Sequence, residues 1–190
     1  KKGNIGSVKS IATKVLIQMN CKLGGAAWLV NLPLKGLMTV GLDVTHDSSD
    51  KSKSYGAFIA SMDLKEKVTY FSAVAPHTRG EECSSNIGIH LRKALMTYKQ
   101  THGTYPERIL MYRDGVGEGD NKYVHEHEVS GLEKCLKELY VQADIQQEPK
   151  FCFIIVSKRI NTRFFTGQGS RYDNPKSGTV VDNTVTLPER

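Results

Sequence analysis

The stretch LMTVGLDV at residues 37–44 decides the fold class of this 190-residue chain. Its residues are mostly apolar or β-branched and Asp43 is its only charged residue, a pattern that predicts a strand buried in a sheet. A second such run, RILMYRD at residues 108–114, ends on Asp114. A carboxylate at the end of a buried strand costs free energy unless it is hydrogen-bonded, paired or bound to a cation. These two runs therefore mark the sheet and the place where chemistry is expected.

Further strands and helices are predicted around these two runs. Short β-branched, aromatic or apolar segments predict strands at 55–63, 67–75 and 151–157, the last buried on both faces. Helical periodicity predicts helices at 10–22, 80–103 and 127–140. The resulting order of three strands, helix, strand, helix and strand predicts an α/β fold, an RNase H-like mixed sheet with flanking helices. In that topology the first strand lies beside the fourth.

Charge and composition limit the class of protein. Of the 26 Lys and Arg residues, six lysines lie in residues 1–36 without any Asp or Glu, so the basic excess is N-terminal. Such a segment can attract phosphate, although a solvated lysine face explains it equally well. The four cysteines lack zinc-site spacing, and we expect reduced, mostly buried thiols. No signal peptide or membrane span is expected, which leaves the cytoplasm or the nucleus.

Asp43 and Asp114 should converge if their strands are neighbours. Two converging carboxylates with open coordination positions suit Mg²⁺, which binds few protein oxygens and keeps waters or substrate phosphate. Two such ions can promote the hydrolysis of a phosphodiester. An equally weighted alternative is that both aspartates only form turns after their strands.

Four segments resemble signature segments of the PIWI domain of Argonaute proteins, in the same order. They are MTVGLDVTHDSS (38–49), YRDGVGEGD (112–120), KRINTRFF (158–165) and SGTVVDNTVT (177–186). The phrase YVHEHEV (123–129) favours the animal PIWI clade. The resemblance runs from about residue 10 to the end. It implies a piRNA-guided, Mg²⁺-dependent endoribonuclease that cleaves complementary RNA in transposon and gene silencing.

The same resemblance implies a domain arrangement. Residues 1–36 would be the end of the MID domain and the MID–PIWI junction, and residues 37–190 a PIWI domain that lacks its C-terminal part. The fourth metal ligand of the family, usually a histidine, would follow residue 190. We therefore expect the isolated fragment to be inactive and its intact parent to cleave.

Catalytic residues are also implied by the resemblance. Asp43 and Asp114 match the two aspartates that bind magnesium, with the backbone carbonyl of Val44 as a candidate helper. Glu81, in the segment TRGEE, matches the mobile catalytic glutamate, and Glu82 is its nearest competitor. Without the resemblance, Glu81 would be read as an acidic residue that favours a helix N-terminus.

Guide-binding residues are implied at two places. Gln18 and Lys22 are four apart on a predicted helix and resemble residues that hold the 5′-phosphate of the guide. The residues that would contact the guide backbone are Lys158, Arg159, Asn161 and Arg163. An exposed polar pair and a solvated charge run are the alternatives.

Two other functions remain open. One is a guided binding module that recruits silencing partners without cutting, and the other is an unguided RNase H-like nuclease or integrase-type domain. The expected partners are a guide RNA, a complementary target RNA and silencing-pathway proteins, and no membrane. The expected location is the cytoplasm, including perinuclear granules, with the nucleus as the alternative.

Overall fold

The structure is a computed structural model that describes residues 5–50, 53–63, 69–78, 83–114, 116, 121–158 and 160–182. The chain divides into two compact units, residues 1–157 and residues 158–190. Within the described residues, no helix has the length and apolar character needed to cross a membrane.

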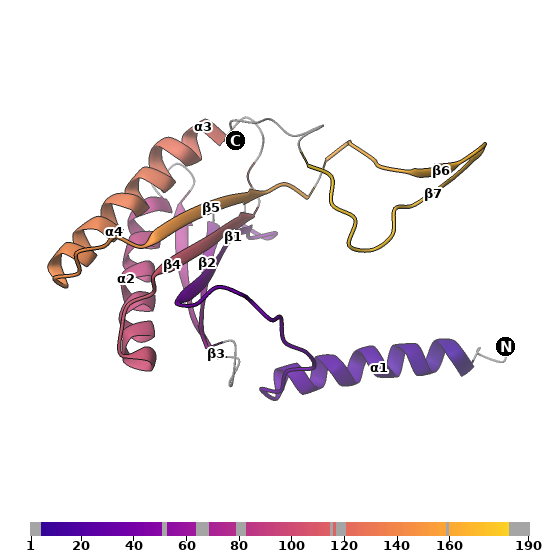
Figure 1. Cartoon of the computed structure of the whole chain (residues 1–190), viewed down its shortest axis with the longest axis horizontal. Coiled ribbons are helices and arrows are strands. Elements are labelled where there is room, and N and C mark those ends of the chain that lie inside the picture. Colours follow the sequence, from indigo (N-terminus) through magenta and orange to yellow (C-terminus); the bar gives the residue numbers. More distant parts are fainter. Residues whose placement is uncertain are drawn as a thin grey trace. The chain divides into compact units, whose positions relative to one another are not determined.

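A five-stranded mixed sheet forms the centre of the first unit (Figure 1). Its strands are β1 (Leu37–His46), β2 (Lys53–Asp63), β3 (Thr69–Thr78), β4 (Arg108–Asp114) and β5 (Lys150–Val156). They lie in the order β3-β2-β1-β4-β5. β2 pairs antiparallel with both β1 and β3, whereas β4 pairs parallel with β1 and β5. The predicted neighbourhood of the first and fourth strands is confirmed.

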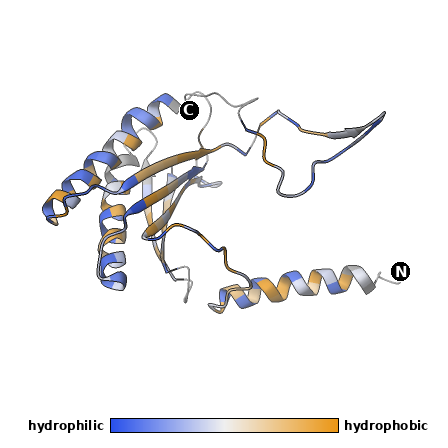
Figure 2. Ribbon diagram, in the orientation of Figure 1, coloured by the Kyte–Doolittle hydropathy of each residue, from blue (hydrophilic) through white to orange (hydrophobic). Residues whose placement is uncertain are grey.

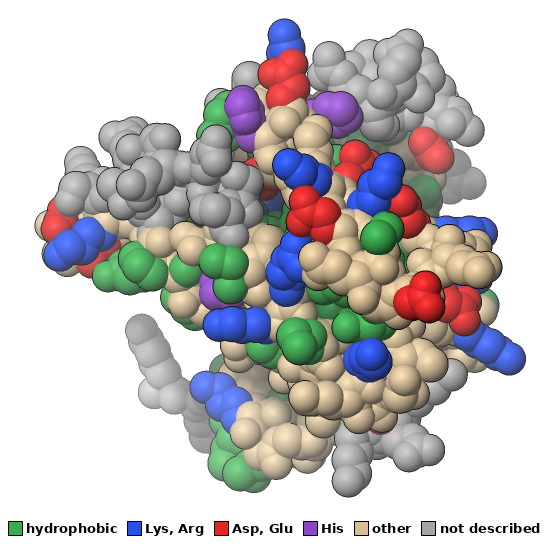
Figure 3. Space-filling view, turned by 90° about the vertical axis from the view of Figure 1, so that its left-hand side faces the viewer, with side chains coloured by type: hydrophobic (Ala, Val, Ile, Leu, Met, Phe, Trp, Pro, Cys, Tyr) green, Lys and Arg blue, Asp and Glu red, His purple; other side chains and the backbone are tan. Residues whose placement is uncertain are grey.

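Two long helices, α2 (Cys83–His102) and α4 (Ser130–Gln142), cover one face of this sheet (Figure 1). They bury an apolar stripe against alternate residues of the central strands. Figure 2 shows hydrophobic residues in orange in these strands and at intervals along both helices. Leu91 and Leu95 of α2 and Leu132 of α4 are almost fully buried in this core. The solvent-facing side of the same layer carries basic and acidic side chains interspersed (Figure 3). The core therefore lies between the sheet and these helices.

The opposite face of the sheet is more exposed. In β1 the side chains of Met38, Val40 and Leu42 point into the core, so the alternate residues point the other way. On that other face Ile59 and Tyr112 remain substantially exposed. The alternation decides where each functional side chain is presented.

Three predictions about individual elements need correction. β5 is an edge strand of the sheet with alternating exposed and half-buried residues, so the prediction that it is buried on both faces is wrong. The helix predicted at residues 127–140 corresponds to α4, which begins only at Ser130. It is preceded by α3 (Asn121–Tyr123) and by a π-helical segment, η2 (Val124–Val129). Cys21 and Cys152 are exposed thiols and Cys135 is buried, so two of these three thiols depart from the expected burial.

Outside the sheet and its helical layer, the structure contains a further helix and a hairpin of two strands. The first unit begins with α1 (Ile5–Lys22), which extends the predicted N-terminal helix by five residues. The second unit contains a short antiparallel hairpin, β6 (Thr166–Gln168) with β7 (Arg171–Asp173), which the sequence pattern did not predict.

Candidate active site

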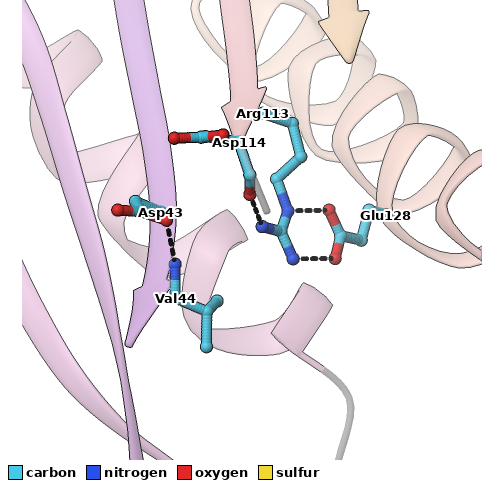
Figure 4. Close-up of polar contacts among 5 residues, drawn as sticks. All are labelled: Asp43, Val44, Arg113, Asp114 and Glu128. Carbon is cyan, nitrogen blue, oxygen red and sulfur yellow. Dashed lines mark hydrogen bonds and ion pairs between the residues drawn. The ribbon is translucent and has the colours of Figure 1, made fainter. Parts of the chain in front are cut away.

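Asp43 and Asp114 lie at the carboxyl ends of neighbouring parallel strands. The register pairs Leu37 with Arg108 and continues to Leu42 with Arg113, so the next position of each strand is an aspartate. Because Leu42 and Arg113 are both buried on the helix side, the two aspartates point to the opposite face. Figure 4 shows both carboxylates on the same side of the two strands. Both aspartates therefore lie at adjacent strand ends and on one face of the sheet, as the predicted topology requires.

The support of Asp43 is local. The side chain is exposed, and one carboxylate oxygen accepts a hydrogen bond of 2.9 Å from the backbone N–H of Val44 (Figure 4). Behind it, on the helix side, Leu42 and Phe58 pack into the core. The role of the Val44 backbone carbonyl as a helper stays a prediction.

A small cavity adjoins the end of β1. Its volume is about 20 Å³, and its lining includes Asp43, Phe58, Asn86, His90 and Arg113. Both ring nitrogens of His90 are buried without a hydrogen-bond partner among the described residues. Burial lowers the pKa of His90, and nearby Lys93 lowers it further. The imidazole is therefore held in its neutral form beside the candidate site.

Asp114 has a different kind of support, which comes from an ion pair behind the sheet. The Arg113 Nε donates to Glu128 Oε2 at 3.0 Å, and Nη2 donates to Oε1 at 3.3 Å. The remaining amino group, Nη1, donates to the backbone carbonyl of Asp114 (Figure 4). Arg113 is 8% exposed and Glu128 only 3% exposed. A forked, buried pair of this kind has a fixed geometry, because water does not compete for its hydrogen bonds.

Glu128 was not among the residues that the sequence pattern singled out. The inward positions are Val124, Glu128, Leu132 and Leu136, at steps of four residues. Steps of four drift around a regular α-helix of 3.6 residues per turn, whereas the wider π-helical turn accommodates an additional residue. The only sequence signal for the burial of Glu128 was its spacing, since it lies four residues before Leu132, which is buried in the core.

The other expected site residues have different outcomes. Glu81, Glu82 and Arg159 lie outside the described residues. Gln18 and Lys22 are both exposed on α1, in its last two turns. In the second unit Lys158, Asn161 and Arg163 are also exposed, and Arg163 Nη1 donates to the carbonyls of Ile160 and Thr162. Their roles in guide binding stay predictions.

The donor set suits a hard divalent cation. Two carboxylates from adjacent strands share one accessible face, which leaves coordination positions for water or phosphate oxygens. Within the described ranges, no group of three or more His, Cys, Asp or Glu side chains is placed to hold a metal ion. The geometry and the chemistry of Asp43 and Asp114 are therefore compatible with Mg²⁺ and less so with zinc, which prefers nitrogen and sulfur ligands.

The sheet order and the paired strand-end carboxylates together define an RNase H-like α/β domain. A family model described as "Piwi domain" matches residues 1–190. Piwi-like protein Siwi of Bombyx mori is 53% identical over 184 residues, which cover 97% of this chain and 20% of that protein. Protein aubergine of Drosophila melanogaster is 53% identical over 181 residues, or 95% of this chain and 20% of that protein.

Solved structures agree with these matches. The crystal structure of Drosophila Piwi has a TM-score of 0.73 and 41% identity, and the match covers 95% of this chain and 24% of that one. The crystal structure of Kluyveromyces polysporus Argonaute with a guide RNA has a TM-score of 0.69 and 24% identity, over 82% of this chain and 19% of that one, and shares the fold. The chain belongs to the Piwi domain family, in the PIWI clade of Argonaute proteins.

The chain spans about a fifth of the length of the relatives it matches. Argonaute PIWI domains as a class are RNase H-like and generally use divalent metal ions. The boundary expected at residue 36 stays a prediction, because the family model matches the chain without dividing it.

Proposed function

We propose that the protein containing this chain is a small-RNA-guided endoribonuclease of the piRNA type, which cleaves complementary RNA in transposon and gene silencing. The observation that carries the proposal is the placement of Asp43 and Asp114 side by side on one accessible face of the sheet. A domain that only binds a guide has no need for two adjacent carboxylates, which repel a phosphate backbone unless a cation lies between them.

In this proposal Asp43 and Asp114 hold Mg²⁺, and Glu81 is the third catalytic carboxylate. When bound, the metal supplies charge that activates a water and stabilises the leaving oxygen. The protein's contribution is to direct both carboxylates to one face of the sheet and to fix them in register. Bound between them, Mg²⁺ would offset the repulsion between these negative charges and the phosphate.

The guide is proposed to be held by separate parts of the chain. Gln18 and Lys22 are four residues apart and exposed on α1, so they share a helix face that can contact a 5′-phosphate. Lys158, Arg159, Asn161 and Arg163 are proposed to contact the guide backbone. Silencing-pathway proteins are the other proposed partners, and the proposed location is the cytoplasm, including perinuclear granules.

The test is a cleavage assay on the intact parent, loaded with a 5′-phosphorylated guide and given complementary RNA and Mg²⁺. We expect scission at one position measured from the guide, and its loss on chelation of the metal. Asp43→Asn and Asp114→Asn should each slow cleavage by at least about a hundred-fold, because the chemistry depends on exact placement of charge. Binding of the guide–target pair, measured on filters, should remain.

The matched control is Asp47→Asn, in the turn that follows β1. Hydrogen bonds from the Ser49 hydroxyl and from the backbone N–H groups of Ser49 and Asp50 lower the pKa of Asp47. The Asp47 carboxylate therefore stabilises the turn. Cleavage should stay close to wild type in this variant. Tight target binding without any metal-dependent scission by the wild type would instead support the guided binding module.

A further inference from the structure

We infer that Arg113 and Glu128 are positioning residues, which fix Asp114 from behind the sheet by joining the end of β4 to the π-helical segment η2. This inference rests on the proposed function, in which Asp114 holds a metal. Neither residue faces the site itself. They would act on the reaction only through the direction and the rigidity of Asp114.

The alternation of a strand makes this arrangement possible. Arg113 points to the helix side and is buried there, while the next residue, Asp114, points to the open face. A single guanidinium can therefore hold Glu128 with two nitrogens and the backbone carbonyl of Asp114 with the third (Figure 4). Asp114 is the last residue of β4, so this contact fixes the carbonyl at the point where the strand ends.

A second arginine–glutamate pair shows what is special about the first. Arg92 of α2 and Glu138 of α4 also bridge two elements, at 2.8 Å, but their side chains are 35% and 46% exposed. The side chains of Arg113 and Glu128 are 10% and 4% exposed. A surface ion pair contributes little to stability, because water solvates both charges when the pair is broken. A buried ion pair holds its geometry, and removal of one partner is costly because the other charge stays buried.

Stability alone does not explain a charged pair at this place. Glu128 occupies the inward position that precedes Leu132, where an apolar side chain would extend the core without burying charge. Apolar replacements of buried ion pairs are often as stable or more stable. What an apolar side chain cannot do is donate a hydrogen bond to the Asp114 carbonyl. That contact is the reason we assign the pair a positioning role.

The test uses the intact, guide-loaded parent with a non-cleavable target and Mn²⁺ as the probe, because free Mn²⁺ is counted directly by its paramagnetic resonance signal. The central variant is the double replacement Arg113→Met with Glu128→Leu. We expect its thermal midpoint to stay close to that of the wild type, and its Mn²⁺ dissociation constant to rise about ten-fold or more, as is usual when support behind a metal ligand is removed. Wild-type Mn²⁺ affinity in the double variant would overturn the inference.

Further variants separate the remaining outcomes. Arg113→Lys keeps the positive charge but loses the forked hydrogen bonds of the guanidinium, so it should also weaken Mn²⁺ binding. If the double variant does not fold, the Mn²⁺ affinity of Arg113→Lys tests the positioning role instead. Glu138→Gln, in the exposed pair, should leave Mn²⁺ affinity unchanged, and an equal weakening there would contradict a role specific to Arg113. Asp114→Asn should also reduce Mn²⁺ binding. If it does not, the proposed metal site itself is wrong, which is distinct from a failure of the positioning role alone.

Discussion

The carboxyl ends of β1 and β4 present neighbouring aspartates on one face of one sheet, yet the two ends are supported by different physical means. Behind Asp43 lie the apolar side chains of the core and a small cavity that borders a neutral His90. Behind Asp114 lies a buried ion pair. Packing holds a strand end approximately and tolerates small adjustments, whereas a forked charge pair has one geometry. The difference suggests that the end of β4 is the more rigid half of the site.

The largest expected effect tests the support behind β4. Glu128→Gln leaves the Arg113 guanidinium buried without its counter-charge, so the free energy of unfolding should fall by about 3–5 kcal/mol. Asp43→Asn, at the exposed end of β1, should change it by less than about 0.5 kcal/mol. Urea unfolding of the chain followed by far-ultraviolet circular dichroism measures both.

The exposed pair again supplies the control for this measurement. Glu138→Gln should cost no more than about 1 kcal/mol, because surface ion pairs contribute little. Equal losses for Glu128→Gln and Glu138→Gln would break the distinction between the two strand ends, since burial would then have no effect on the strength of the pair.

The sequence predicted the end of β1 better than the end of β4. An aspartate at the end of a mostly apolar run marked both strand ends, with Asp43 as the only charged residue of its run and Asp114 directly after Arg113. The place of β1 beside β4 also followed from the order of the elements. These features depend on local composition and on chain connectivity, which a sequence displays directly.

Three features could not be read in this way. The inward direction of Glu128 depends on the π-helical segment η2, in which Val124 and Glu128 are buried. The exposure of β5 depends on its place at the sheet edge, which an apolar run alone does not reveal. The fork between Arg113 and Glu128 joins residues 15 apart through tertiary packing. Each is set by the assembled structure.

A smaller effect is expected from the packing behind β1. Leu42 is 7% exposed and borders the cavity of about 20 Å³, so Leu42→Ala enlarges an existing void. The free energy of unfolding should fall by about 2 kcal/mol, at the low end for a buried leucine because the site is already loosely packed. Leu42→Met, which keeps the volume, should cost less than about 1.5 kcal/mol and serves as the control. If both substitutions cost the same in urea unfolding, the end of β1 is not held by packing.

The smallest expected effect is a pH dependence from His90, in the same cavity behind β1. Burial, followed by the charge of Lys93, lowers the pKa of His90 below its ordinary value of 6.5. The unfolded chain therefore binds a proton at a higher pH than the folded chain, so His90 lowers stability as the pH falls below about 6.5, until the folded pKa is reached. The cavity that His90 lines also borders Asp43 and Arg113.

His90→Leu removes this titration and the two unpartnered ring nitrogens together. Thermal midpoints measured across pH 5–8 should show a shallower decline towards acid in His90→Leu than in the wild type. His125→Gln, which changes an exposed histidine of η2, should follow the wild-type curve. Because both variants lose one histidine, only the buried position distinguishes them. Parallel curves for His90→Leu and the wild type would mean that the imidazole behind β1 reaches water or a partner, and that the end of β1 is not supported by a dry apolar layer.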